Sequence, residues 1–224
     1  MRAFNFSGAR LFIVIPTVAL AACSSGPKPA DWQLEAKGAM ERSVAAYLEG
    51  NSRVEAAEFA RARTAISSTG RIELAAKAEL LHCASRVASL VFEPCLGFEK
   101  LRVDAAPAER AYADYLSAKL QPNDIAQLPP QQRAAATSGE TALKAIDDSL
   151  SRLVAAGVLF QNGRASPALV QVAVDTASAQ GWRRPLLAWL GVQASLAEKA
   201  GDSEQAARVR RRMDLVEGKA KVNR

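Results

Sequence analysis

The sequence predicts an all-α protein of about eight antiparallel helices, and three observations support this prediction. Of the 224 residues, 49% are hydrophobic and 23% are charged, a balance typical of a chain that buries a core. From Asp31 onward, apolar residues recur every three or four positions, and strand-like alternation is nearly absent. Glycine, asparagine and proline separate the periodic segments, as helix ends require.

Four helices are expected in an N-terminal helical half, residues 31–120. Asp31 is the expected N-cap of the first helix, and a capping box at Ser52–Glu55 starts the second helix directly after Gly50. Pro94 lies beyond the end of the third helix, which it cannot continue. The four helices are predicted at residues 31–49, 52–68, 71–91 and 107–120.

A proline-rich irregular connection is expected at residues 121–138, with a short helical piece near 130–136. It divides the N-terminal half from a C-terminal helical half, residues 139–217, and a basic tail follows at 218–224. Ser166 and Asp202 are expected N-caps, because each precedes a periodic apolar segment. The C-terminal helices are predicted at residues 139–160, 167–180, 183–200 and 203–217.

Short connections make consecutive helices αα-hairpins, and several hairpins in a row suggest a solenoid. In the last pair, Gly201 and Asp202 lie at the hairpin, with Ala206 five residues after the glycine and Ala194 seven before it. This pattern resembles a tetratricopeptide repeat (TPR), in which small residues at these positions let two helices pack closely. Arg210 stands where the repeat usually has a large aromatic residue. The fold is therefore expected to be a TPR-like solenoid or an irregular helical bundle.

Residues 1–22 have the pattern of a cleaved signal peptide. Arg2 and Arg10 precede the apolar run LFIVIPTVAL, which is shorter than the ~20 residues of a membrane-spanning helix. The following Leu20-Ala21-Ala22-Cys23 resembles the lipobox of bacterial lipoproteins. The resemblance implies cleavage before Cys23, a diacylglycerol on its sulfur and an acylated N-terminus, with palmitate among the acyl chains.

Cys23 would then be a stable membrane anchor, because each buried CH₂ of its acyl chains contributes ~0.8 kcal/mol. Residues 23–30 would form the lipidated cysteine and a short tether. Ser24-Ser25 lacks the aspartate that retains such lipoproteins in the inner membrane. The resemblance therefore implies a lipid-anchored protein on the periplasmic side of the outer membrane.

The positive charge is concentrated at the C-terminus. The formal charge of +6 falls to +4 without residues 1–22, from 27 basic and 23 acidic residues. Residues 208–224 hold seven basic and two acidic residues, so residues 23–207 carry a net charge of −1. A secreted and lipidated chain does not meet cellular nucleic acid, so we expect no nucleic-acid partner.

Cys83 and Cys95 are the two cysteines that remain in an oxidising compartment once Cys23 carries lipid. A helix from Cys83 to about Phe92 rises ~13 Å, and three extended residues return ~10 Å. The remaining distance is only just compatible with the ~4.4–6.8 Å between the Cα atoms of a disulfide. We predict a Cys83–Cys95 disulfide, which unwinding of the last helical turn would favour. The alternative is a buried cysteine and a separate loop thiol.

No residue pattern indicates catalysis, a metal site or a cofactor. His82 is the only histidine, and the positions four residues away are Ala78 and Arg86, which do not complete a metal site. It lies off the apolar stripe of its helix, so we expect a surface histidine. Asp147 and Asp148 are adjacent and point about 100° apart, so they cannot act together as an acid–base pair. We therefore expect a protein that is not an enzyme.

Two groups of residues are candidates for binding: Trp182, Arg183 and Arg184, and, on the last helix, Arg208, Arg211 and Arg212. The first group could line the edge of a groove, because tryptophan and arginine are common anchors, or its tryptophan could pack in the core. The second group could contact anionic headgroups, lipopolysaccharide phosphates or an acidic partner. The alternative for the second group, which we favour, is a solvated face that suits a helix C-terminus.

These observations together predict a non-enzymatic outer-membrane lipoprotein. Its periplasm-facing helical scaffold would bind a protein or peptide partner of the cell envelope. The alternative is an envelope factor that binds the cell wall or lipopolysaccharide through its basic C-terminal helix.

Overall fold

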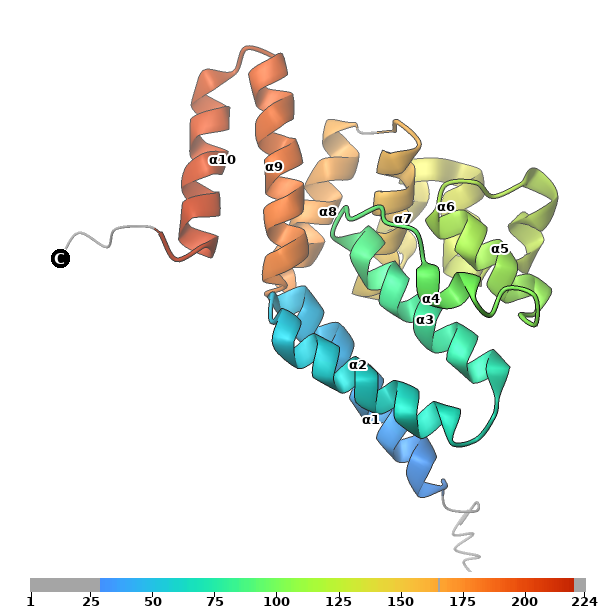
Figure 1. The fold of residues 1–224 in the computed structure, drawn as a ribbon. Coiled ribbons are helices and arrows are strands. Elements are labelled where there is room, and N and C mark those ends of the chain that lie inside the picture. Colours follow the sequence, from blue (N-terminus) through green and yellow to red (C-terminus); the bar gives the residue numbers. More distant parts are fainter. Residues whose placement is uncertain (1–28, 165, 220–224) are drawn as a thin grey trace, which may run out of the picture.

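The computed structural model describes residues 29–164 and 166–219 (Figure 1). Within these ranges the protein has ten α-helices, two 3-10 helices and no strand, which confirms the predicted all-α class. No helix in this part of the chain is long and apolar enough to span a membrane. The helices are α1 (Asp31–Glu49), α2 (Ser52–Ser67), α3 (Ile72–Ala88), α4 (Leu96–Glu99), α5 (Pro107–Leu116), η1 (Pro122–Gln127), α6 (Pro130–Ser138), η2 (Gly139–Ala145), α7 (Ser149–Gln161), α8 (Pro167–Ala179), α9 (Arg183–Lys199) and α10 (Ser203–Val216).

The α1–α2 hairpin forms the lower arm of the molecule in Figure 1. Ala30 is the N-cap of α1, so the predicted cap, Asp31, is instead its first helical residue, where a carboxylate favours the helix dipole. Asn51, and not Ser52 of the predicted capping box, caps α2 by accepting a hydrogen bond from the backbone N–H of Val54 at 3.2 Å. A small core joins both helices to α3 and consists of Ala36, Ala39, Met40, Phe59, Ala62, Ile66 and Ala78.

Helices α3 and α7 cross at the centre of the main core. Their backbones approach closely at Gly157, because a Cβ there would lie 3.0 Å from Cγ1 of Val87 and closer still to its carbonyl oxygen. The indole Nε1 of the fully buried Trp189 donates a hydrogen bond of 3.1 Å to the carbonyl oxygen of Ala88, at the end of α3. The core extends to Val209 in α10, so helices from both predicted halves share it.

Helices α7, α8, α9 and α10 pack against one another in sequence order, as the units of a repeat array do. The N-terminal helices depart from this pattern, since α3 packs on α7 and α1 packs on α9 (Figure 1). A solenoid unit contacts only its neighbours in sequence. The fold is therefore array-like in its C-terminal part and irregular as a whole.

The stretch 121–138 contains more regular structure than predicted, because η1 and α6 occupy most of it. Gln132 anchors this stretch and is 2% exposed. It accepts a hydrogen bond from the hydroxyl of Tyr115 at 2.8 Å and donates one to the carbonyl oxygen of Ser151 at 3.0 Å. Both amide ends of the buried side chain are thus satisfied, as burial of a polar group requires.

The prediction of one continuous helix over 139–160 was wrong. Helix η2 ends at Ala145, and α7 begins at Ser149 with Asp148 as its N-cap. The break frees backbone carbonyl groups, and Arg152 donates hydrogen bonds to the carbonyl oxygens of Leu143 and Ile146, at 3.2 and 2.9 Å. Two further helices also end earlier than predicted, α3 at Ala88 and α5 at Leu116.

Candidate functional site

The predicted Cys83–Cys95 disulfide is present, with a Cα–Cα distance of 5.9 Å. Helix α3 ends at Ala88, earlier than predicted, because Leu90 adopts a left-handed conformation with φ of 60°. This early end makes room for the chain to return to Cys83. The N–H groups of Leu90 and Val91 bond to the carbonyl oxygens of Val87 and Arg86, which closes the helix end. The chain then turns back along α3, and the disulfide holds this return loop, residues 89–95, in place.

The return loop presents Phe92 to solvent next to the last turn of α7. Phe92 is 37% exposed and stacks on Phe160 with the ring centroids 6.1 Å apart. The Phe160 ring in turn meets the edge of the buried Trp189 ring at 5.7 Å. The two phenylalanine rings therefore extend the core outward to the surface.

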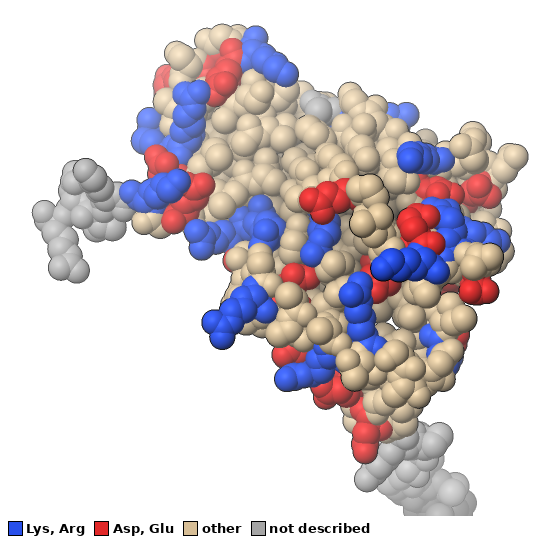
Figure 2. All heavy atoms as spheres, in the orientation of Figure 1, with Lys and Arg blue, Asp and Glu red and all other residues tan. Residues whose placement is uncertain are grey.

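A cavity of about 510 Å³ opens beside these rings, between the end of α7 and one side of α9. Figure 2 shows a wide area without charged side chains over α9, and the exposed Glu93 of the return loop lies outside it. This side of α9 has only small side chains at Ala188, Gly191 and Ser195. A Cβ built on Gly191 would meet nothing within 4 Å, so space remains above the helix there. We call this region the α7–α9 surface; its residues are Phe92, Phe160, Gly163, Ala188, Gly191, Val192, Ser195, Leu196 and Lys199.

The candidate residues at the start of α9 lie at the joint between the first and last hairpins. Arg184 donates a hydrogen bond of 2.7 Å to the carbonyl oxygen of Tyr47 and one of 2.8 Å to the hydroxyl of Ser52. Its guanidinium also lies over the Tyr47 ring, 4.3 Å from the centroid. Trp182 is half-buried against the main core, and Arg183 is exposed. Arg184 thus has a packing role that sequence reasoning missed.

The candidate arginines of α10 are mostly engaged within the protein. Arg208 forms an ion pair with Glu204 at 2.9 Å, and Arg212 donates a hydrogen bond of 3.0 Å to the hydroxyl of Ser178 in α8. Arg211 is exposed and has no ion pair among the described residues. On the face drawn in Figure 2, the basic and acidic side chains of this hairpin are interspersed.

His82 lies in a partly buried polar cluster between α2 and α3 and not on the open surface, contrary to the sequence-based expectation. Its Nε2 lies 2.7 Å from Oε1 of Glu55, whose side chain Arg86 also approaches at 3.3 Å. The imidazole stacks on Phe59 with a centroid distance of 3.9 Å. Burial, followed by the charge of Arg86, lowers the pKa of His82, so the neutral ring with a proton on Nε2 suits this site.

Two further glutamates are buried between helices, and each has a basic partner. Glu79 in α3 accepts two hydrogen bonds from Arg63 in α2, at 2.6 and 2.8 Å. Glu109 in α5 lies 3.6 Å from Nζ of Lys77 in α3. A buried carboxylate without such a partner would be strongly destabilising. These pairs join α2, α3 and α5, and sequence reasoning missed them because each partner lies on another helix.

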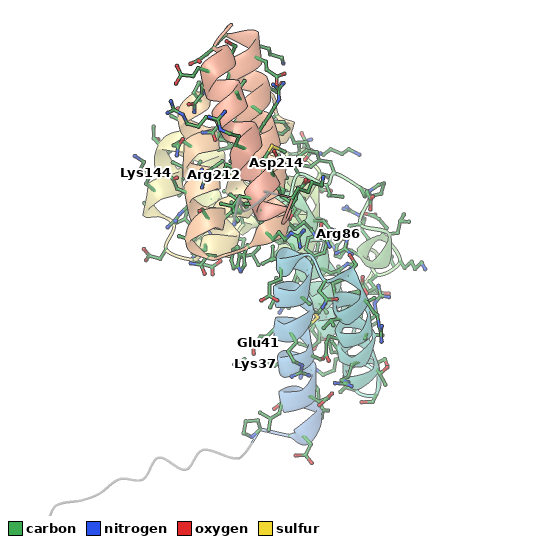
Figure 3. All side chains as sticks on the ribbon, turned by 90° about the vertical axis from the view of Figure 1, so that its left-hand side faces the viewer. Lys37, Glu41, Arg86, Lys144, Arg212 and Asp214 are labelled. Carbon is green, nitrogen blue, oxygen red and sulfur yellow. A yellow bond between two sulfur atoms is a disulfide. The ribbon has the colours of Figure 1, made fainter. Side chains whose placement is uncertain are left out.

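A second apolar groove lies between α1 and α3 and has a volume of about 350 Å³. Three basic side chains flank it, and each has an acidic neighbour: Lys37 with Glu41 at 3.9 Å, Arg71 with Glu73 at 2.7 Å, and Lys77 with Glu109 at 3.6 Å. Figure 3 shows Lys37 and Glu41 together on the same side of α1. We call it the α1–α3 groove; its apolar lining is Trp32, Ala36, Met40, Ile66, Leu74, Ala78 and Leu81.

No cluster of three metal-ligating side chains occurs within residues 29–164 and 166–219. Cys23, the tether up to residue 28 and the last five residues of the basic tail lie outside the described residues. No family model, no curated protein and no solved structure matches the chain.

Proposed function

We propose that this protein is a non-enzymatic, lipid-anchored scaffold of the outer membrane that faces the periplasm and binds a protein or peptide partner of the cell envelope. The lipobox-like sequence Leu20-Ala21-Ala22-Cys23 supports the lipid anchor. The α7–α9 surface is the observation that carries the binding function.

The α7–α9 surface has the composition of a protein-binding site. Its centre is apolar and contains two aromatic rings, whereas Lys199 lies at the margin, and an apolar centre with a polar rim is the usual anatomy of an interface. Buried aromatic residues commonly supply most of the binding energy. A soluble protein rarely leaves such an area open without a partner.

The shape of the surface favours a helical or extended segment as the partner. Ala188, Gly191 and Ser195 follow one another at helical spacing along α9, so a second backbone can approach closely there. The array-like α7–α10 packing leaves this side of α9 beside a cavity, as in repeat proteins that bind peptides in a groove.

In-cell crosslinking with mass spectrometry tests the proposal. One dominant envelope protein should be captured by the wild-type chain. Val192→Glu should abolish capture because it places a charge in the half-buried centre of the surface. Val103→Glu is the matched control, since Val103 is 85% exposed on another part of the protein and should retain capture. A Cys23→Ala chain should lose the partner if anchoring is required.

Capture of the same partner by the Val192→Glu chain, with both variants folded by circular dichroism, would refute the role of the α7–α9 surface. Recovery of glycan or lipopolysaccharide without a protein would instead favour the alternative function through α10. That alternative has less support, because Arg208 and Arg212 are already engaged with side chains of the protein itself.

A further inference from the structure

The end of the molecule formed by the first turns of α1 and α3 exposes several large apolar side chains. Leu34 is 57% exposed and Ile72 is 42% exposed, and neither belongs to the α7–α9 surface. Trp32 and Leu74 belong to the same first turns and line the α1–α3 groove, whereas Leu34 and Ile72 lie on other sides of their helices. We call these four residues the apolar tip. Apolar side chains exposed around one end of a molecule indicate a contact of that end with another apolar phase.

The position of the apolar tip in the chain argues for the membrane as this phase. Trp32 is the second residue of α1, and Pro29 is the sixth residue after Cys23. Six extended residues span at most ~20 Å, so a lipid on Cys23 holds the tip close to the bilayer. The α9–α10 turn lies at the opposite end of the molecule (Figure 1). The nineteen-residue α1 is itself ~28 Å long, so this turn is far from the tip.

The residue types at the tip suit the membrane–water interface. Tryptophan is enriched there because its ring is apolar and its N–H can still meet water or headgroups. Lys37, Arg71 and Lys77 flank the groove, and Glu41, Glu73 and Glu109 lie beside them. Glu35 is paired with Arg61 at 3.6 Å, and Asp31 adds one acidic side chain in the first turn of α1. The tip is therefore close to neutral, and its attraction to lipid has to come from apolar burial and not from charge.

We propose that the apolar tip is a membrane-contacting surface, which lies in the interfacial region of the phospholipid bilayer that holds Cys23. This proposal rests on the lipid anchor of the proposed function but not on its protein partner. It orients the protein with α1 and α3 toward the membrane and the α9–α10 turn away from it. Because the tip is nearly neutral, zwitterionic phospholipid suffices for the contact and added salt does not weaken it.

Fluorescence quenching by brominated lipid tests the proposal on the full-length protein purified from membranes. The protein is reconstituted in phosphatidylcholine vesicles whose acyl chains carry bromine, which quenches tryptophan at contact. We expect quenching of the wild type at low and high salt. Trp32→Phe should lose this quenching, whereas the control Trp182→Phe should retain it, because Trp182 lies half-buried at the start of α9.

Two exposed leucines provide a matched pair of further variants. Leu34→Glu should reduce the quenching, because it places a charge on the surface that contacts lipid. Leu215→Glu should leave quenching unchanged, because Leu215, 66% exposed, belongs to α10. Both side chains are exposed, so neither change should affect folding, and circular dichroism checks this.

Flotation of the vesicles distinguishes membrane attachment through the lipid anchor from membrane contact through the apolar tip. Protein that floats with the vesicles but shows no quenching attributable to Trp32 would overturn the membrane-contacting tip and leave the anchor in place. Protein that stays unlipidated by mass spectrometry and does not float would overturn both. Quenching that disappears at high salt would also contradict the proposal, since it would indicate an electrostatic contact. Crosslinking at the α7–α9 surface reports the protein partner independently of all three results.

Discussion

Replacement of Gly157 by alanine should strain the crossing of α3 and α7. The added methyl group would meet the backbone carbonyl oxygen of Val87, which cannot rotate away as the end of a flexible side chain can. Overpacking of a core typically costs 1–3 kcal/mol, and we expect about 3 kcal/mol here because a backbone atom is in contact. The glycine also makes α7 less stable than alanine would, by up to about 1 kcal/mol.

Gly191→Ala is the matched control for this prediction. Gly191 lies within α9, and a Cβ added there meets nothing within 4 Å, so this variant should gain about 1 kcal/mol from helix propensity alone. The propensity gain cancels between the two variants. The difference between their free energies of unfolding therefore isolates the cost of contact with Val87, about 3 kcal/mol.

Urea denaturation followed by circular dichroism measures this difference, and thermal unfolding should show a gap of roughly 6–12 °C between the two variants. An unchanged m-value would confirm that the native and unfolded states are comparable. If Gly157→Ala were as stable as Gly191→Ala to within about 0.5 kcal/mol, the value typical of neutral surface changes, the close crossing of α3 and α7 would be refuted.

Three further predictions concern the links between helices. Changing both Cys83 and Cys95 to serine should lower the free energy of unfolding by about 3 kcal/mol, because the disulfide closes a loop with a sequence separation of 12 residues. Denaturation without reductant measures this loss, and an unchanged midpoint would contradict it. Burial and a neighbouring arginine lower the pKa of His82, so as pH falls below about 6.5 the unfolded chain takes up a proton that the folded chain does not. Stability should therefore decrease between about pH 7 and 5, and His82→Gln should flatten this dependence in urea titrations; equal slopes would exclude a role for His82. Arg184→Ala should speed amide exchange at the α1–α2 turn because two hydrogen bonds are lost, whereas the exposed control Arg183→Ala should not.

Most helices could be predicted from the sequence because their signals are local. The helical repeat of apolar residues marked α1, α2 and α9 to within a residue at each boundary, and the N-cap Asp202 marked the start of α10 correctly. The disulfide could be predicted for the same reason, since only a short segment separates Cys83 from Cys95. Helix α3 ends at Ala88, and the left-handed Leu90 reverses the direction of the chain, which brings the two cysteines together.

The apolar periodicity did not reveal the break before α7, although the N-cap Asp148 is a local signal of the same kind as Asp202. The apolar pattern continues through Ile146, whose side chain is 2% exposed and packs in the core although the helix is interrupted there. Arg152 donates a hydrogen bond to the backbone carbonyl oxygen of Ile146, which the break leaves without a helical partner. The His82 cluster was missed for a different reason. Glu55 lies 27 residues before His82, and only the packing of α2 on α3 brings them together.

The sequence by itself determined that the chain is helical, where helices such as α1, α2 and α9 begin and end, and that Cys83 and Cys95 can be bonded. Only the tertiary structure decided which apolar faces are covered and which stay open. Periodicity shows that one side of a helix is apolar, but it does not show which neighbour packs there. At the α7–α9 surface and the apolar tip, helices present apolar residues that no neighbour within residues 29–164 and 166–219 covers completely, and both proposals rest on these surfaces.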